Sequence, residues 1–246
     1  MEIRRFRKLK NGMYQLDLGD SKLVLHEDLI LKHELLLKKE VSESEKEFLV
    51  QENLKYEAME FALRDIERRL KTKLEISENL RKKGYSSDVI EFVLLELGAR
   101  GYLNEEFYVE CFIHDKLLFS SDGPLKIENE LRLKGITSLV IQSKIGVFTE
   151  SEEMMRATKI VHKLAIKNRA SRMAFLKKSK YHLERLGYHA FVIDSVLSSV
   201  ELDNQREEEL LKKEYQKVYG KLSKKYEGAE LEWKVKQKMY QKGFKM

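Results

Sequence analysis

"LRKKGYSSDVI", residues 80–90, returns with small changes as "LRLKGITSLVI" at 131–141 and as "LERLGYHAFVI" at 183–193. A shortened copy, "MYQKGF", follows at 239–244. One glycine stands at the same place in every copy, and successive glycines are roughly 50 residues apart. These glycines are Gly84, Gly135, Gly187 and Gly243. A period of this length is the mark of a repeat architecture, so this stretch decides the fold.

Each copy predicts an amphipathic helix, a stop at the glycine and a second helix after a tight corner. A glycine just past a helix adopts the left-handed backbone conformation, where a side chain would cost about 1–2 kcal/mol. The residue after it then packs on the apolar residue four positions before the glycine, as in a Schellman cap. The pairs are Leu80–Tyr85, Leu131–Ile136, Leu183–Tyr188 and Met239–Phe244. Ser86 and Thr137 are predicted to cap the helices that follow their corners. His189, at the equivalent position of the third copy, is a poorer cap.

The rest of the chain predicts a mainly α fold with a small N-terminal β element. Of the 246 residues, 36% are charged and 42% are hydrophobic, and Pro124 is the single proline. So few helix breakers, with so much Leu, Lys and Glu, favour helices. Pro124 itself suits the first turn of a helix. Turn signals at Asn11-Gly12 and Gly19-Asp20 predict two or three strands near 2–10, 13–18 and 22–26.

One more helix fits between successive corners, which predicts tandem three-helix repeats. Such a unit cannot bury its own apolar faces, so neighbours stack, and we expect an elongated curved array. The predicted divisions are a β-hairpin-like extension with a connecting helix at 1–45, repeats at 46–117, 118–169 and 170–225, and a partial fourth repeat or C-terminal helix at 226–246.

The sequence carries no recognised pattern of catalytic or metal-binding residues. The chain has no "GxxxxGK[ST]" loop, and its six histidines show no HExxH or paired Cys/His spacing. Cys111 is the only cysteine, which excludes an intrachain disulfide, and its apolar-spaced neighbours predict a core position. We therefore expect a protein that is not an enzyme and that uses no cofactor or metal.

The chain also lacks membrane and export signals. No stretch approaches the ~20 apolar residues of a membrane span, and "MEIRRFRKLK" has no apolar signal core. A cytoplasmic protein with no membrane partner is expected.

Positive charge grows along the chain, from a local net charge of −3 in residues 51–110 to +6 in residues 171–246. Basic residues stand just before each corner, and on one face of a stacked array they would form a stripe. They are Arg81, Lys82, Lys83, Arg132, Lys134, Lys177, Lys178, Lys180 and Arg185. Such a stripe could bind nucleic-acid phosphates or acidic patches of a protein filament. The alternative is that these charges only keep a helical surface soluble.

A family resemblance sharpens this choice. "RGYLNEEFYVECFIHDKL" at 100–117, followed by "DGPLKIENELRLKGI" at 122–136, closely resembles the RecX family of RecA modulators. The likeness spans roughly residues 54–225 and departs at Cys111, His114 and His189. It implies a monomer that lies in the groove of the RecA–DNA filament and regulates filament growth, ATPase, strand exchange and coprotease activity. RecA is then the main partner, and single- or double-stranded DNA a weaker or indirect one.

Two other functions remain open beside this one. A DNA-reading helix-turn-helix would carry polar base readers on its second helices. Those helices, "SSDVIEFVLLELGAR", "SLVIQSKIGVF" and "AFVIDSVLSSV", are mainly apolar or acidic, which favours packing. With Trp233 as the only tryptophan, a base-stacking platform has little support. A helical-repeat DNA-binding or scaffold protein acting on another partner is the remaining alternative.

Overall fold

The computed structural model describes residues 1–10 and 12–244. The chain divides into two compact units. Unit 1 comprises Met1–Tyr108 with Lys134–Ile136, and unit 2 comprises Val109–Leu133 with the described residues from Thr137 onward.

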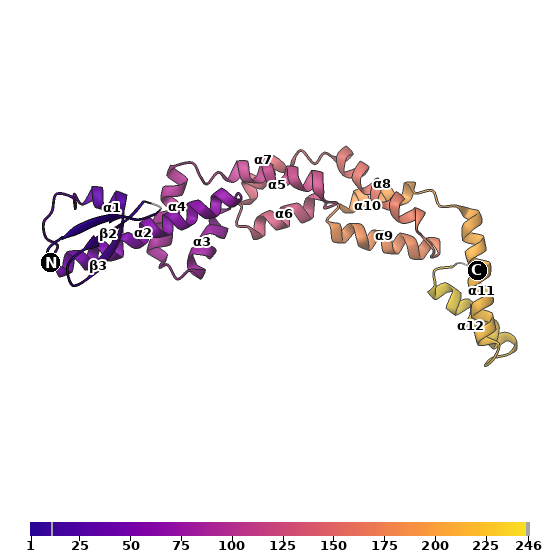
Figure 1. Ribbon diagram of the computed structural model, residues 1–246. Helices are drawn as coiled ribbons and strands as arrows, with labels where there is room; N and C mark the ends of the chain where they lie inside the picture. The colour runs from indigo at the N-terminus through magenta and orange to yellow at the C-terminus, as the bar shows by residue number, and fades with distance from the viewer. Residues whose placement is uncertain (11, 245–246) are drawn as a thin grey trace. The chain divides into compact units, whose positions relative to one another are not determined.

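The N-terminal residues form a three-stranded antiparallel sheet in the order β1-β2-β3, which confirms the predicted β element (Figure 1). The strands are β1 (Arg5–Lys8), β2 (Met13–Asp17) and β3 (Lys22–His26). The turn residue Asn11 lies outside the described residues. Leu23 and Leu25 are buried while Val24 between them is 40% exposed, so β3 follows the two-residue alternation of a strand with one covered face.

Helices make up most of the remaining chain, so the mainly α prediction is confirmed. Their bounds are α1 Glu27–Lys32, α2 Glu43–Arg68, α3 Lys73–Lys82, α4 Ser87–Ala99, α5 Glu105–Phe119, α6 Pro124–Leu133, α7 Ser138–Ile145, α8 Glu150–Ile166, α9 Arg172–Leu186, α10 Ala190–Ser199, α11 Asn204–Leu222 and α12 Gly228–Gln241. In the part of the chain that the structure describes, no helix combines the length and apolarity needed to cross a membrane.

In unit 1 the sheet is joined to α2 through Asn53. The buried Asn53 Oδ1 accepts a hydrogen bond of 2.8 Å from the backbone N–H of His26, and Asn53 Nδ2 donates to the Val24 carbonyl at 3.2 Å. An apolar cluster that includes Leu16, Leu25 and Leu49 fills the space between sheet and helix. The far end of α2 packs with α3 and α4 around a second cluster.

Unit 2 contains an equivalent bundle of α8, α9 and α10. Its core includes Ala157, Val161, Leu183, Val192 and Ile193, all at most 1% exposed. In both bundles the third helix precedes the glycine corner in the chain. The sequence-based division at 118–169 groups α8 with the corner before it, whereas α8 packs on α9 and α10. Periodicity locates the corners but does not tell on which side a helix packs.

The glycine corners have the conformation that a Schellman cap requires. Each glycine has a positive φ, and the φ values are 91° at Gly84, 80° at Gly135, 81° at Gly187 and 84° at Gly243. The backbone N–H of Tyr85 donates to Leu80 O at 3.2 Å, and that of Tyr188 donates to Leu183 O at 3.2 Å. Phe244 N donates in the same way to Met239 O at 3.1 Å. These are the six-residue closures that satisfy carbonyls at a helix end.

The predicted caps after these corners are wrong in one respect. Ser86, Thr137 and His189 stand at the N-cap positions of α4, α7 and α10, yet none of their side chains makes a capping hydrogen bond. The Ser86 and Thr137 side chains are exposed, so the free helix N–H groups beside them are accessible to solvent. His189 is occupied elsewhere, because its backbone N–H donates to the buried Glu153 at 2.7 Å and its Nδ1 lies 2.9 Å from the same carboxylate.

Three of the corners dock on the start of another helix. A methyl group on Gly135 would lie 2.9 Å from Leu74 Cβ at the start of α3, and one on Gly243 would lie 2.7 Å from Ser171 Oγ at the start of α9. A methyl group on Gly187 would lie 2.6 Å from Lys126 Cβ and 2.9 Å from Lys126 Cα at the start of α6. Glycine is therefore required at these corners for two reasons: the backbone is left-handed, and there is no space for a side chain.

Docking also completes hydrogen bonding at the helix starts. At α6, the N–H of Gly123 donates to Leu186 O at 2.7 Å and that of Leu125 donates to Gly187 O at 3.0 Å. Between them Pro124 has no N–H to satisfy. At α9, Ser171 Oγ donates to the Lys242 carbonyl at 2.7 Å. The carbonyl end of one helix thus meets the N–H end of another, which also aligns their dipoles favourably.

The α3 start is held by a charged pair instead. Thr72 and Glu75 form a capping box, and Glu75 Oε1 accepts from Lys134 Nζ at 2.7 Å. Burial alone would raise the pKa of Glu75, but the hydrogen bonds from Lys134 and from the Thr72 N–H lower it below the usual value. The same contact raises the pKa of Lys134 against the opposing effect of burial.

Replacing single glycines by alanine should separate the two requirements. Gly84→Ala meets no atom within 4 Å, so only the left-handed conformation opposes it, at about 1 kcal/mol. Gly187→Ala adds a clash with the Lys126 backbone and should cost about 1–3 kcal/mol more. Gly98→Ala, with open space and an ordinary helical φ, is the control and should be neutral or stabilising. Urea denaturation followed by circular dichroism measures all three; equal losses at Gly84 and Gly187 would show that docking contributes nothing.

The Lys134–Glu75 pair should make stability depend on pH. Because the folded-state pKa of Glu75 is lowered, its contribution is present above the unfolded value of 4.5 and is lost as pH falls through the folded value. Lys134→Gln should therefore destabilise unit 1 by about 1 kcal/mol at pH 7 and by much less near pH 3. Arg132→Gln, which breaks the ion pair with Glu128 within α6, is the control. A loss at Lys134 that stays constant from pH 7 to pH 3 would contradict the role of Glu75.

Candidate partner-binding surface

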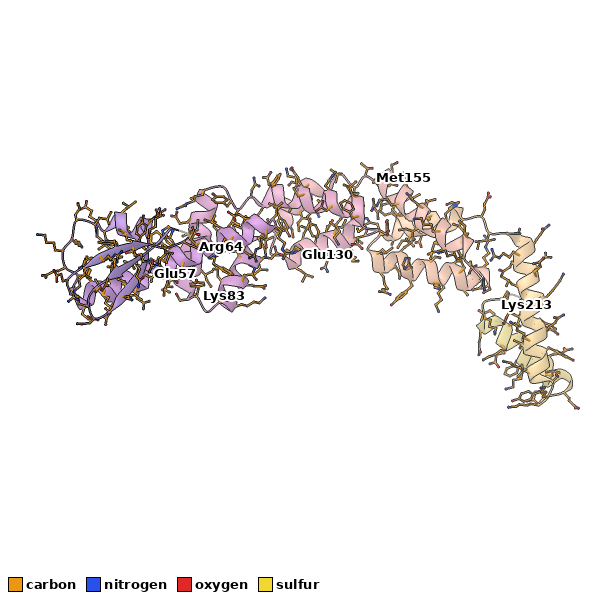
Figure 2. The ribbon with its side chains drawn as sticks, in the orientation of Figure 1. Glu57, Arg64, Lys83, Glu130, Met155 and Lys213 are labelled. Atoms are coloured by element: carbon orange, nitrogen blue, oxygen red, sulfur yellow. The ribbon has the colours of Figure 1, made fainter. Side chains whose placement is uncertain are left out.

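The first corner exposes its basic residues. Arg81 and Lys82 lie in the last turn of α3 and both are exposed. Lys83 at the C-cap is exposed as well (Figure 2). Lys83 Nζ lies 5.4 Å from the centre of the Phe61 ring. Cations at a helix C-terminus interact favourably with the helix dipole, so this cluster costs the fold little. Its charges are available to a partner.

The second corner uses its basic residues within the chain. Arg132 Nη2 lies 2.7 Å from Glu128 Oε2 on the same helix. Lys134 is partly buried, paired with Glu75 and close to the Tyr108 ring, with 6.0 Å from Nζ to the ring centre. Sequence pattern alone cannot distinguish such a structural lysine from a solvated one.

The third corner combines free and engaged charges on α9. Lys177 and Lys178 are exposed and make no ion pair within the described residues. Lys180 Nζ lies 3.0 Å from Asp194 Oδ1, and this hydrogen bond raises the lysine pKa. Arg185 lies over the exposed Tyr181 ring, 5.9 Å from its centre. Aromatic rings at this corner are therefore not all consumed by capping, since Phe191 on α10 is also 55% exposed.

The predicted structural positions lie mostly in the interior. Leu80, Leu131 and Leu183 are fully buried, Ile136 and Tyr188 are at most 4% exposed, and Pro124 is buried. Tyr85 is partly buried and packs against the α2–α3–α4 core. Tyr188 also donates from its hydroxyl to Ser121 O at 3.1 Å, which ties the third corner to the loop before α6.

Among the described residues, no group of three or more His, Cys, Asp or Glu side chains is arranged to hold a metal ion. Cys111 is partly exposed, so its predicted core position is wrong; its neighbours Val109 and Ile113 take the buried face of α5 instead.

One surface, on α8 and its C-cap residue, is not predicted from the sequence. Lys159, Lys163 and Lys167 stand four residues apart and line a groove of about 630 Å³ within unit 2. The regular spacing of three lysines was visible in the sequence, but the apolar groove beside them was not, because its walls also come from α5 and α9.

Comparison with known proteins places the chain in a family. The family model described as "RecX, first three-helix domain" matches residues 58–97, which run from α2 to α4. The chain is 31% identical to "Regulatory protein RecX" of Lactococcus lactis subsp. cremoris (strain MG1363), over 99% of this chain and 93% of that protein. It is 30% identical to the protein of the same name from Streptococcus agalactiae serotype III (strain NEM316), over 99% and 95%.

Solved structures show the same fold. A crystal structure of regulatory protein RecX superposes with a TM-score of 0.70 at 18% identity, covering 81% of this chain and all of the other. RecX from Lactobacillus salivarius superposes with a TM-score of 0.55 at 22% identity, covering 59% and 95%. Identity of about 30% over nearly the whole of both sequences, together with this fold, shows that the chain belongs to the RecX family of regulatory proteins.

Proposed function

We propose that the chain regulates the RecA recombinase by binding along the RecA–DNA filament, without catalysing a reaction itself. Support comes first from its near full-length similarity to proteins named regulatory protein RecX. We propose further that it acts in the cytoplasm as a monomer, and that filament growth, ATP hydrolysis, strand exchange and coprotease activity are the properties it changes.

The observation that carries the proposal is the repetition of one corner design. Exposed basic side chains precede the corner at Gly84 and again the corner at Gly187. A chain that repeats a surface suits a partner that repeats its binding site, as a filament does. Each further contact forms at high effective concentration once the first is made, so weak contacts sum to avidity.

DNA is the second candidate for the primary contact. Tyr181, 62% exposed beneath Arg185, and Phe191 could stack with bases beside the lysines of α9. We favour RecA because the family similarity supports a regulator of that protein, and because Lys134 and Arg132 at the second corner are held by carboxylates. These two side chains would therefore be missing from any row of basic residues that binds DNA phosphates.

Titration of the chain into a RecA reaction tests the proposal directly. DNA-dependent ATP hydrolysis by RecA should change, and the change should saturate below one chain per RecA protomer if one chain spans several protomers. The measurement is steady-state ATP hydrolysis at fixed RecA and single-stranded DNA. An unchanged rate at every ratio would sink the proposal and leave a scaffold for another partner.

A charge variant of the third corner distinguishes RecA from DNA. Replacing Lys177, Lys178, Lys180 and Arg185 with glutamine leaves Leu183 and Tyr188 intact, and exposed changes shift stability by about 0.5 kcal/mol each. The effect on the preformed filament should fall strongly, while binding to naked single-stranded DNA should change little. If the residues contact phosphates, the slope of log affinity against log salt should instead drop by about 0.7 per lost contact.

The matched control removes the same charge elsewhere. Lys212, Lys213, Lys224 and Lys225, all exposed on or just after α11, are replaced with glutamine. Equal losses in both variants would assign the effect to net charge, and no loss in the α9 variant would reduce its basic residues to a solvated face.

A further inference from the structure

The groove beside α8 combines two kinds of surface. Lys159, Lys163 and Lys167 line it and are exposed, and none makes an ion pair within the described residues. Its floor contains the partly buried Ile160 and Leu164. At its rim, Leu118 is 60% exposed and Met155 is 59% exposed (Figure 2 labels Met155 on α8).

The charges of this groove are not balanced by the protein. Arg156 also lines it, with its guanidinium held by the carbonyls of Leu117 at 2.9 Å and Ser120 at 2.7 Å. The one carboxylate in the lining is Glu152, which lies 3.7 Å from Arg156. Like charges four residues apart on a helix repel each other. The groove therefore carries an excess of positive charge that an acidic occupant would neutralise.

The spacing of the lysines defines the form of that occupant. Residues four apart on a helix are about 6 Å apart along its axis. Alternate residues of an extended chain are about 6.6 Å apart and point to the same side. A two-turn helix, about 10 Å across and 12 Å long, would fill roughly 900 Å³, more than the groove of about 630 Å³ offers. An extended segment, which is thinner than a helix, therefore suits this groove better.

We propose that this groove binds an extended peptide of a partner protein in which acidic and apolar residues alternate. The acidic side chains pair with Lys159, Lys163 and Lys167, and the apolar side chains between them cover Ile160, Leu164 and the rim. Single-stranded nucleic acid is disfavoured as the occupant because the lining offers no exposed Phe, Tyr or Trp ring for bases to stack on: Tyr188 is 2% exposed, and the exposed ring is the imidazole of His182. The proposal does not depend on RecA and is tested in its absence.

The test uses the full-length chain and synthetic probes in fluorescence anisotropy. One fluorescein-labelled octapeptide alternates aspartate with leucine, and a second has the same composition with its aspartates in one block. The alternating peptide should bind more tightly than the block peptide. Lys159→Gln/Lys163→Gln/Lys167→Gln should weaken its binding about tenfold, as three exposed ion pairs would. Leu118→Ser/Met155→Ser, at exposed positions that do not threaten folding, should weaken it as well.

The control variant Lys212→Gln/Lys213→Gln/Lys236→Gln removes the same charge from exposed positions outside the groove and should bind the alternating peptide like the unmodified chain. Equal affinity for both peptides, or equal loss in both lysine variants, would overturn the proposal in favour of unspecific attraction. If a labelled oligothymidylate binds more tightly than the alternating peptide, and the triple lysine variant abolishes that binding, the occupant of the groove is nucleic acid and not a peptide. Absence of binding to either peptide would also overturn it.

Discussion

The contact on which the rest of this protein depends is the approach of a glycine corner to the start of another helix. At Gly187 the backbone of the corner lies so close to Lys126 that no side chain fits between them. The same approach brings carbonyls at the end of α9 to the N–H groups of Gly123 and Leu125. Two helix ends that would otherwise need water or capping side chains satisfy each other. Neither end can move without leaving buried polar groups unpaired, so the contact positions every helix attached to it.

The docking of a corner on another helix explains why basic residues at equivalent positions of the repeat have different roles. Lys134 faces the start of α3 and donates a hydrogen bond to Glu75, so its charge is neutralised within unit 1. Lys177 and Lys178 stand a full turn or more before their corner and remain in solvent. A repeat protein can therefore keep its docking contacts constant while its exposed positions vary.

Much of the fold could be predicted from the sequence, because its signals are local. A glycine with a positive φ and an apolar residue on each side of it determine a corner within six residues, and the strands around Gly12 and Gly19 are equally local. What could not be predicted depends on residues distant in the chain. The sequence around Gly135 and Gly187 does not reveal that these glycines lie against Leu74 and Lys126, which are about sixty residues earlier in the chain.

The candidate site was less predictable for the same reason. Spacing identified exposed lysines and ion-paired lysines alike, and only the partner carboxylates of Lys134 and Lys180 tell them apart. Ser86 and Thr137 have the residue type of a cap without its hydrogen bond, since solvent competes for their hydroxyls. The lysines of α8 were overlooked because a groove requires walls from separate helices.

The direction of docking has a consequence for synthesis on the ribosome. Every docked corner serves a helix that begins earlier in the chain: Gly135 serves α3, Gly187 serves α6 and Gly243 serves α9. At roughly 5–20 residues per second, each helix start waits on the order of 3–14 s for its partner to be made. A chain truncated after α10 would lack the corner that completes α9, so the damage would fall in the α8–α9–α10 bundle, which the cut itself leaves whole. The docked helix starts are thus completed in chain order, α3 first and α9 last.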